Sequence, residues 1–298
     1  MKSNPLVSVA IITYNQKDFL KEAIESVLSQ QYEPIEIVVG DDCSSDGTKE
    51  LLEEYQLKYP SKFILKISSQ NKGITANSNE VNFACNGKYV AWLGGDDLML
   101  PEKISTQVAY LESHPNCNIL YHNLDVFDSS TGKTLYYFNS KNKKFEGGVD
   151  IVIKYGTFNG ACATMVRRSA APDYGFDINI PIASDWLFWV EHLSKGGEIK
   201  YIDKVLGRYR RHAGNVTSHL SDYARQGYDD LVTTCDIILK KFPGYKKEVY
   251  YRLSIIYRSR RIIEYKSNLI KSIHYNFFNI PSWIMLLVYL LSFKKIKL

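Results

Sequence analysis

Residues Tyr89–Met99 read Tyr-Val-Ala-Trp-Leu-Gly-Gly-Asp-Asp-Leu-Met. The first five form an apolar run with β-branched and aromatic members, which predicts a buried strand. Two glycines then end the strand and let the backbone approach a ligand closely. Asp96 and Asp97 follow at the carboxyl end, the edge where open α/β sheets bind ligands. Because adjacent carboxylates repel unless a cation compensates, we interpret Asp96 as the anchor of a divalent metal that carries a diphosphate; a solvated turn is the alternative.

Apolar strands alternate with amphipathic helices around this stretch. Strands are predicted at Val7–Thr13, Ile35–Gly40, Phe63–Ser68 and Tyr89–Leu93, and helices at Lys17–Gln30, Thr48–Tyr59 and Ile74–Cys85. The alternation predicts βαβ units and a mostly parallel sheet, the α/β class. Because parallel strands share a direction, the polar ends Tyr14-Asn15, Asp41-Asp42 and Asp96-Asp97 are expected at one edge of the sheet. Such a convergence favours a binding site over three unrelated turns.

The second half of the chain carries further predicted elements. They are a hairpin at Gly132, a strand over Asn159–Val166, a helix from Ser184 to Leu193, helices at Ser221–Phe242 and Tyr245–Ile273, and an apolar segment at Phe277–Phe293.

The composition bounds the class of protein. A chain of 298 residues with 45% hydrophobic and 23% charged residues can fill a core and is not disordered. The five cysteines are scattered and the N-terminus has no apolar secretory segment, so a reducing, cytoplasmic location is expected. No GxGxxG follows the first strand, which disfavours an NAD enzyme.

Charge is distributed unevenly. Lys240–Leu298 holds 13 Lys and Arg against two acids, a net +11, whereas the whole chain is +5. This asymmetry suggests an anionic surface as partner, although a solvated helix face is the alternative. Nucleic acid is disfavoured, because no recognised nucleic-acid-binding motif accompanies the bases.

The apolar run Trp283–Leu291 lies near the C-terminus and is followed by Lys294, Lys295 and Lys297. It is shorter than the roughly 20 residues that a spanning helix needs. A helix lying in the interface of an anionic membrane is one interpretation, which would place the protein on the inner face of the cell membrane. A core helix or a homodimer contact is the other.

Four segments together resemble the family 2 inverting glycosyltransferases, which have the GT-A fold. They are Val7–Asn15, Asp41–Thr48, Asn71–Gly73 and Gly87–Asp97, in the family's order and spacing, and the resemblance extends from Pro5 to Thr217. It implies a GT-A domain over residues 1–218 and leaves 219–298 as a helical, basic extension. It also implies metal-dependent transfer, with inversion, of a sugar from a nucleoside diphosphate sugar to a hydroxyl of a glycan or lipid-linked acceptor, in the manner of bacterial surface-polysaccharide enzymes.

The resemblance also assigns the donor site. It implies donor contacts from Thr13, Tyr14, Asn15, Asp41, Asp42, Lys72, Gly95, Asp96, Asp97 and Arg210, with Tyr14 and Asp42 at the base and ribose. Gly94-Gly95-Asp96 stands at the family's Asp-x-Asp position, so Asp96 is expected to bind Mn²⁺ or Mg²⁺, with His212 as a second ligand. Gly94 replaces the first acid of that motif. A solvated basic turn is the alternative for the segment with Arg210 and His212.

The segment that starts at Ser184 resembles the family's Glu-Asp-Trp-x-x-Trp motif, whose Asp is the general base. Asp185 is therefore the catalytic candidate, and Ser184 replaces the Glu. An ordinary cap at the start of a helix is the alternative for Asp185. Gly94 and Ser184 also leave open a nucleotide-sugar-binding or membrane-binding protein that keeps the fold without turnover.

Overall fold

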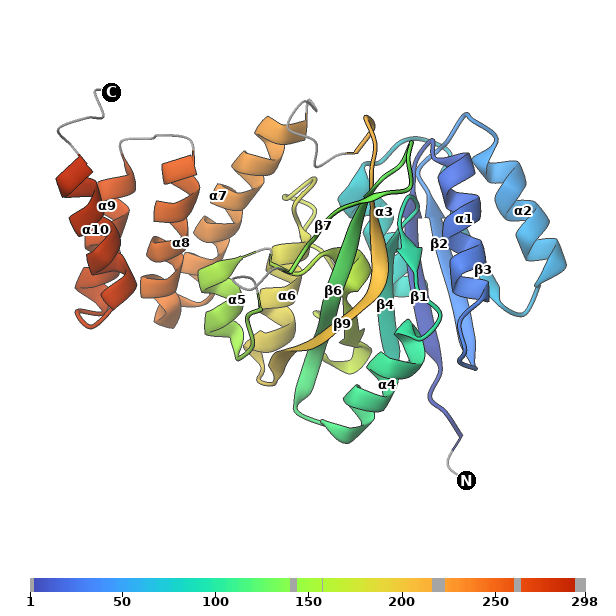
Figure 1. Cartoon of the computed structure of the whole chain (residues 1–298), viewed down its shortest axis with the longest axis horizontal. Helices are drawn as coiled ribbons and strands as arrows, with labels where there is room; N and C mark the ends of the chain where they lie inside the picture. Colours follow the sequence, from blue (N-terminus) through green and yellow to red (C-terminus); the bar gives the residue numbers. More distant parts are fainter. Residues whose placement is uncertain (1–2, 140–143, 157, 216–222, 260–263, 293–298) are drawn as a thin grey trace.

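The computed structural model describes residues 3–139, 144–156, 158–215, 223–259 and 264–292. A nine-stranded sheet crosses the molecule in the order β3-β2-β1-β4-β8-β6-β9-β5, and β7 pairs with β6. Helices cover the sheet, and a row of further helices lies beyond α5 and α6 (Figure 1). The predicted α/β class is therefore confirmed.

The N-terminal part forms the parallel half of the sheet. Its strands are β1 (Val7–Thr13), β2 (Ile35–Asp41), β3 (Phe63–Ile67) and β4 (Tyr89–Gly94), and its helices are α1 (Lys17–Leu28), α2 (Thr48–Lys58) and α3 (Ile74–Ala84). All seven residues of β2 are buried, as expected for a parallel strand covered on both faces. On α1 the buried residues Leu20, Ala23, Ile24 and Val27 follow the helical period. The predicted boundaries agree with these to within two residues.

The second part adds the antiparallel strand pairs. Its elements are β5 (Leu98–Met99), α4 (Lys103–Ser113), β6 (Cys117–Asp128), β7 (Thr134–Tyr137), α5 (Val149–Tyr155), β8 (Met165–Arg167), α6 (Asp185–Ser194) and β9 (Glu198–Arg211), with 3₁₀ turns at Ala161–Ala163 and Arg168–Ala170. A third 3₁₀ turn, at Pro243–Tyr245, comes later in the chain. β8 pairs antiparallel with both β4 and β6, whereas β6 and β9 are parallel. The predicted hairpin at Gly132 is confirmed by β6 and β7.

In the described part of the chain after β9, four helices follow: α7 (Tyr223–Lys241), α8 (Lys246–Ser259), α9 (Glu264–Tyr275) and α10 (Ile280–Ser292). α7 packs on α6 and α8 packs on α5, so buried Cys235 and Val249 belong to the same hydrophobic core as the sheet. α9 packs on α8 and α10 on α9, which places α10 far from the sheet (Figure 1). The predicted domain boundary at residue 218 lies outside the described residues. Within the described part, no helix is long and apolar enough to cross a bilayer.

Two sequence-based predictions are wrong. Asn159–Val166 is not one strand, because Thr164 bonds to Asn159 and to the Gly160 carbonyl and closes a turn before β8. Tyr245–Ile273 is not one helix either. α8 and α9 are separate and pack against each other, which buries Leu269 of α9.

Candidate functional site

The carboxyl ends of β1, β2 and β4 lie side by side, as predicted. Thr13 is in register with Asp41, and Ile12 with Gly94. The two loops after β1 and β2 are hydrogen-bonded to each other, because the Asn15 N–H donates to Ser44 Oγ at 2.7 Å and Asn15 Oδ1 accepts the Ser45 N–H at 2.8 Å. Beside them the Tyr14 side chain is 46% exposed, a position from which its ring can stack on a planar group.

Asp41 and Asp42 are buried and organise the loops around them. Asp42 accepts the backbone N–H groups of Lys72 at 2.7 Å and Gly73 at 2.8 Å. Asp41 accepts the N–H and hydroxyl of Ser44, but burial outweighs these bonds and raises the pKa of Asp41. The Lys72 ammonium pairs with Glu80 at 2.5 Å. The structure thus brings Asp41, Asp42 and Lys72 together, with the backbone of Lys72 rather than its charge against Asp42.

Gly94, the last residue of β4, and Gly95 after it leave room for a ligand to approach the backbone closely. A Cβ at Gly94 would lie 2.8 Å from Oδ1 of Asp96, and a Cβ at Gly95 would lie 2.8 Å from the Thr13 side chain. An acid at position 94 would therefore displace the Asp96 carboxylate.

Asp96 contacts two side chains that follow β9. Its Oδ2 lies 2.9 Å from Nε2 of His212 and accepts the Asn215 amide N–H at 3.0 Å. The Asn215 amide oxygen accepts the His212 backbone N–H at 2.7 Å, and the His212 ring packs on Phe19 with centroids 4.7 Å apart. Sequence reasoning missed Asn215, although a polar residue three positions after His212 at the end of a resembling segment was an available signal.

The Asp96 carboxylate is an oxygen ligand of the kind that Mg²⁺ and Mn²⁺ prefer, and the His212 imidazole is a nitrogen ligand that suits Mn²⁺ better than Mg²⁺. Neighbouring ligands of an octahedral Mg²⁺ or Mn²⁺ lie about 3 Å apart, close to the observed 2.9 Å. Both side chains retain access to solvent, at 14% for His212 and 16% for Asp96. The Gly214 N–H donates to Nδ1 of His212 at 3.2 Å, so the neutral ring carries its proton on Nε2, where a cation would replace it.

The protein supplies few ligands for such an ion. Among the described residues no group of three or more His, Cys, Asp or Glu side chains could hold a metal. The remaining ligands would have to come from phosphate and water, which is the usual arrangement for Mg²⁺.

Asp97 and Arg210 lie behind Asp96 and brace it. Asp97 accepts the Arg210 backbone N–H at 2.9 Å; burial and then the charge of Asp96 raise its pKa well above the usual range. The Arg210 guanidinium donates to the Asp96 carbonyl at 2.7 Å and to Glu22 at 2.6 Å, and it lies between the rings of Phe19 and Phe127. Since both side chains are buried, their direct contact with a donor stays a prediction.

Asp185 is the first residue of α6, after Ser184 at the N-cap position. The Ser184 side chain makes no cap hydrogen bond; its hydroxyl lies 2.9 Å from that of Thr75 in α3. This contact joins the start of α6 to the start of α3, which follows the loop held by Asp42. Burial raises the pKa of Asp185 to about 6, although backbone N–H groups of Trp186 and Asp185 oppose the shift. A carboxylate with this pKa suits a general base near neutral pH.

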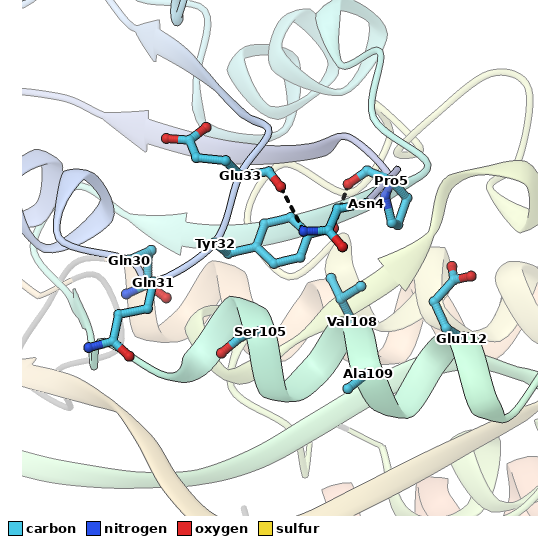
Figure 2. Close-up of a pocket in the computed structure, with 10 residues that line it drawn as sticks. All are labelled: Asn4, Pro5, Gln30, Gln31, Tyr32, Glu33, Ser105, Val108, Ala109 and Glu112. Atoms are coloured by element: carbon cyan, nitrogen blue, oxygen red, sulfur yellow. Dashed lines mark hydrogen bonds between the residues drawn. The ribbon is translucent and has the colours of Figure 1, made fainter. Parts of the chain in front are cut away.

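A large open hollow of about 740 Å³ lies elsewhere. Figure 2 shows its lining, which includes Asn4 and Pro5 before β1, Tyr32 and Glu33 before β2, and Glu112 of α4. These residues precede the strands, so the hollow lies at the opposite edge from Asp96. None of the predicted site residues lines it, and size alone therefore does not locate the chemistry.

Comparison with known proteins agrees with this geometry. Residues 8–175 match Glycosyl transferase family 2. An uncharacterized protein of Mycobacterium tuberculosis is 30% identical over 219 residues; the match covers 70% of this chain and 60% of the relative, so the chain spans less than two thirds of that protein's length. The Escherichia coli protein WfaP, named a UDP-Glc:alpha-D-GlcNAc-diphosphoundecaprenol beta-1,3-glucosyltransferase, is 30% identical over 222 residues, 72% of this chain and 80% of the relative.

Two solved structures share the fold. The Staphylococcus aureus protein TarS (residues 1–349), in complex with UDP-GlcNAc, superposes with a TM-score of 0.66 at 18% sequence identity. The superposition covers 90% of this chain and 81% of the TarS chain. A Pyrobaculum calidifontis mannosyltransferase in complex with GDP-Man and Mn²⁺ superposes with a TM-score of 0.63 at 15% sequence identity, over 99% of this chain and 82% of the mannosyltransferase chain. With its central motifs inside the matched span, the chain belongs to glycosyltransferase family 2.

Proposed function

We propose that this protein transfers a sugar from a nucleoside diphosphate sugar to an acceptor hydroxyl, with inversion at the anomeric carbon. The observation that carries the proposal is the contact of Asp96 with His212 at the sheet edge where β1, β2 and β4 end. This contact offers an oxygen and a nitrogen ligand beside the exposed ring of Tyr14. The family and the nucleotide-sugar complexes of the two structural neighbours support the same reading.

The donor lies along this edge. Tyr14 stacks on the base, and Thr13, Asn15, Asp41 and Asp42 surround the nucleoside, with Lys72 at the loop beside it. Gly95 lets the backbone approach, and Asp97 and Arg210 hold Asp96 in position. Asp96 and His212 would hold Mn²⁺ or Mg²⁺. When bound, such a cation would offset the negative charge of the departing diphosphate.

Asp185 acts as the general base. It takes the proton of the acceptor hydroxyl while that oxygen attacks the anomeric carbon from the face opposite the diphosphate. One carbon–oxygen bond forms as the bond to the diphosphate breaks, so the configuration inverts and no covalent enzyme intermediate is needed. The raised pKa of Asp185, about 6, leaves the side chain ionised at pH 7 yet basic enough to accept the proton.

The acceptor is a lipid-linked or growing surface glycan. The support comes from WfaP, whose name gives a diphosphoundecaprenol-linked sugar as acceptor and which shares 30% identity over 72% of this chain.

A donor screen tests the proposal. The purified chain is titrated with UDP and GDP, with Mn²⁺ or with EDTA, and hydrolysis of the matching nucleotide sugars is then measured. We expect nucleotide binding to depend on the metal, to be lost in Asp96→Asn and to be kept in Asp173→Asn. Asp173 is an exposed carboxylate and serves as the control. Binding without any turnover would instead favour the non-catalytic alternative. No binding of either nucleotide would overturn the donor assignment.

A further inference from the structure

The helix α10 is apolar on nearly all sides: Met285, Leu286 and Tyr289 are partly buried, and most of its other apolar side chains are exposed. Its inner residue Ser282 bonds to Ser272 of α9, and neighbouring Asn279 also bonds to Ser272. Most of the apolar residues point outward: Phe278 is 85% exposed, and the exposed set on α10 and the turn before it is Phe277, Phe278, Ile280, Trp283, Ile284, Leu287, Val288, Leu290 and Leu291. Among the α10 residues whose side chains are described, Ser282 alone is buried. Water does not stabilise such an arrangement, whereas an apolar medium does.

The charge of this stretch of the sequence has one sign. After Glu264 the sequence contains no Asp or Glu, and its charged residues are Lys266, Lys271, Lys294, Lys295 and Lys297. Lys266 and Lys271 are exposed on α9, on which α10 packs; the Lys271 ammonium lies 5.3 Å from the ring centre of Tyr250 of α8. The last three lie outside the described residues. Positive charge on the helix next to an apolar face suits the headgroups of an anionic bilayer.

We propose that α10 and the turn with Phe277 and Phe278 dock on an anionic lipid surface. The 13 residues of α10 extend about 20 Å, less than the roughly 30 Å hydrocarbon core, so the helix lies in the plane of the interface. A second copy of this chain is a poorer occupant. In a symmetric dimer the same patch meets itself, and lysines then face lysines.

Trp283 gives a direct readout. It is 41% exposed, whereas the other three tryptophans, Trp92, Trp186 and Trp189, are buried. With phosphatidylcholine vesicles that contain phosphatidylglycerol, its fluorescence is expected to shift to the blue and to become protected from acrylamide. Phosphatidylcholine alone or raised salt should reduce both effects, and Trp283→Phe should remove them. Flotation with the same vesicles measures binding independently.

Matched variants decide the outcome. Ile284→Ser combined with Leu287→Ser should lower vesicle binding by at least ten-fold, while Leu57→Ser on α2, equally apolar and 83% exposed, should leave it unchanged. All these positions are exposed, so folding is expected to survive. Protein that never binds anionic vesicles at low salt overturns the proposal. A dimer seen by light scattering and lost in the double variant, with no flotation, would identify a second copy as the occupant.

A different observation carries a second inference. Asp230 of α7 is 1% exposed, and its Oδ2 accepts two backbone N–H groups, that of Ile182 at 2.8 Å and that of Ala183 at 2.9 Å. Its Oδ1 accepts the Gln226 amide at 2.9 Å. Ile182 and Ala183 lie just before Ser184 and Asp185, so a C-terminal helix fixes the backbone that leads into α6.

Other C-terminal side chains hold the rest of α6. Lys241 at the end of α7 pairs with Glu191 at 2.9 Å, and the Arg252 guanidinium of α8 lies 5.3 Å from the Trp186 ring centre. The geometry assigns Asp230 as a positioning residue for Asp185. This assignment rests on the proposed role of Asp185 as the base. It makes the C-terminal helices part of the catalytic apparatus.

The test compares three variants at neighbouring positions. Asp230→Ala is expected to lower kcat by about 10- to 100-fold, as a small misplacement of a catalytic group does, with KM for the donor and nucleotide affinity unchanged. Asp230→Asn should restore most of kcat, because its amide oxygen can still accept both N–H groups. Asp229→Ala, at an exposed neighbour, should behave as the unmodified protein.

Two results would overturn this assignment. One is full kcat in Asp230→Ala. The other is an equal loss of nucleotide affinity and kcat, which would indicate general loosening of the fold. If Asp185→Asn is inactive while Asp230→Ala is fully active, only the positioning role fails. If Asp185→Asn is active, the proposed base fails, and the role of Asp230 fails with it.

Discussion

The Nε2 atom of His212 lies 2.9 Å from Oδ2 of Asp96, although 116 residues separate them in the chain. Asn215 donates to the same oxygen, and Gly214 donates to the far nitrogen of the ring. The carboxylate and the imidazole are therefore held in place before any ion arrives. A preorganised pair loses little side-chain freedom when it binds a ligand.

Replacing either member of this pair should impair metal-dependent donor binding. Asp96→Ala is expected to weaken nucleoside diphosphate affinity in Mn²⁺ by about 10²-fold, roughly 2.7 kcal/mol, and His212→Ala by a smaller factor. Calorimetric titration with Mn²⁺ and with EDTA measures both. In EDTA the variants and the unmodified protein should bind the nucleoside diphosphate with the same affinity. Unchanged affinity of Asp96→Ala in Mn²⁺ would remove Asp96 from the site.

Asp185→Asn separates a base from a helix cap. Loss of a general base should lower kcat by about 10²–10⁴-fold with nucleotide affinity retained, whereas Asn caps a helix about as well as Asp. In the unmodified protein kcat should fall as the pH drops below about 6, where the base becomes protonated. Near-normal turnover of the variant, or a flat profile across that range, would place the base elsewhere.

Although Asp185→Asn should lower kcat, it should not lower the free energy of unfolding. The pKa of Asp185 is raised from 3.8 to about 6 in the folded protein, so folding becomes less favourable as the pH rises between these values. At pH 8 the free energy of unfolding of Asp185→Asn should therefore be equal to that of the unmodified protein or higher, by up to about 3 kcal/mol. Urea denaturation at pH 8 checks this. A clear loss of stability would indicate that the carboxylate is structural.

The parallel half of the fold was predictable because its signal is local. Each strand from Val7 to Leu93 is an apolar run, each helix follows with its own period, and the polar residues stand at strand ends. The contacts of Asp96 were less predictable, since Asn215 and Arg210 reach it through the pairing of β9 with β6 and β5. The role of Asp230 was not predictable. Nothing in the sequence near α7 shows that its carboxylate binds the backbone before Asp185.

Gly94→Ala should affect the site rather than the fold. The added Cβ would lie 2.8 Å from Oδ1 of Asp96, so the carboxylate must turn away from its present position. Metal-dependent nucleotide affinity is expected to fall about ten-fold, while the free energy of unfolding changes by less than about 1 kcal/mol. Gly244→Ala, where the added Cβ meets nothing within 4 Å, is the control. Calorimetric titration and urea denaturation of both variants measure the two quantities, and unchanged affinity would contradict the steric argument.

Lys103 presents a buried charge that the sequence could not reveal. Its side chain is fully buried at the start of α4, and its ammonium donates to Gln107 Oε1 at 2.9 Å. Burial lowers the pKa of Lys103 to about 7, against 10.5 in the unfolded chain. Between these values the unfolded chain binds one proton more than the folded protein. The free energy of unfolding should therefore rise with pH across that window.

Lys103→Met removes this dependence at similar volume. Below pH 7 the free energy of unfolding of the variant should exceed that of the unmodified protein. Above pH 7 this difference in free energy, the gap, should shrink by about 1.4 kcal/mol for each pH unit and reach its minimum near pH 10.5. Urea denaturation at pH 6 and pH 9 measures the gap, with Lys21→Met at an exposed position of α1 as control. Equal gaps at the two pH values would mean that Lys103 keeps its ordinary pKa in the folded protein, through a partner or water that reaches its ammonium group.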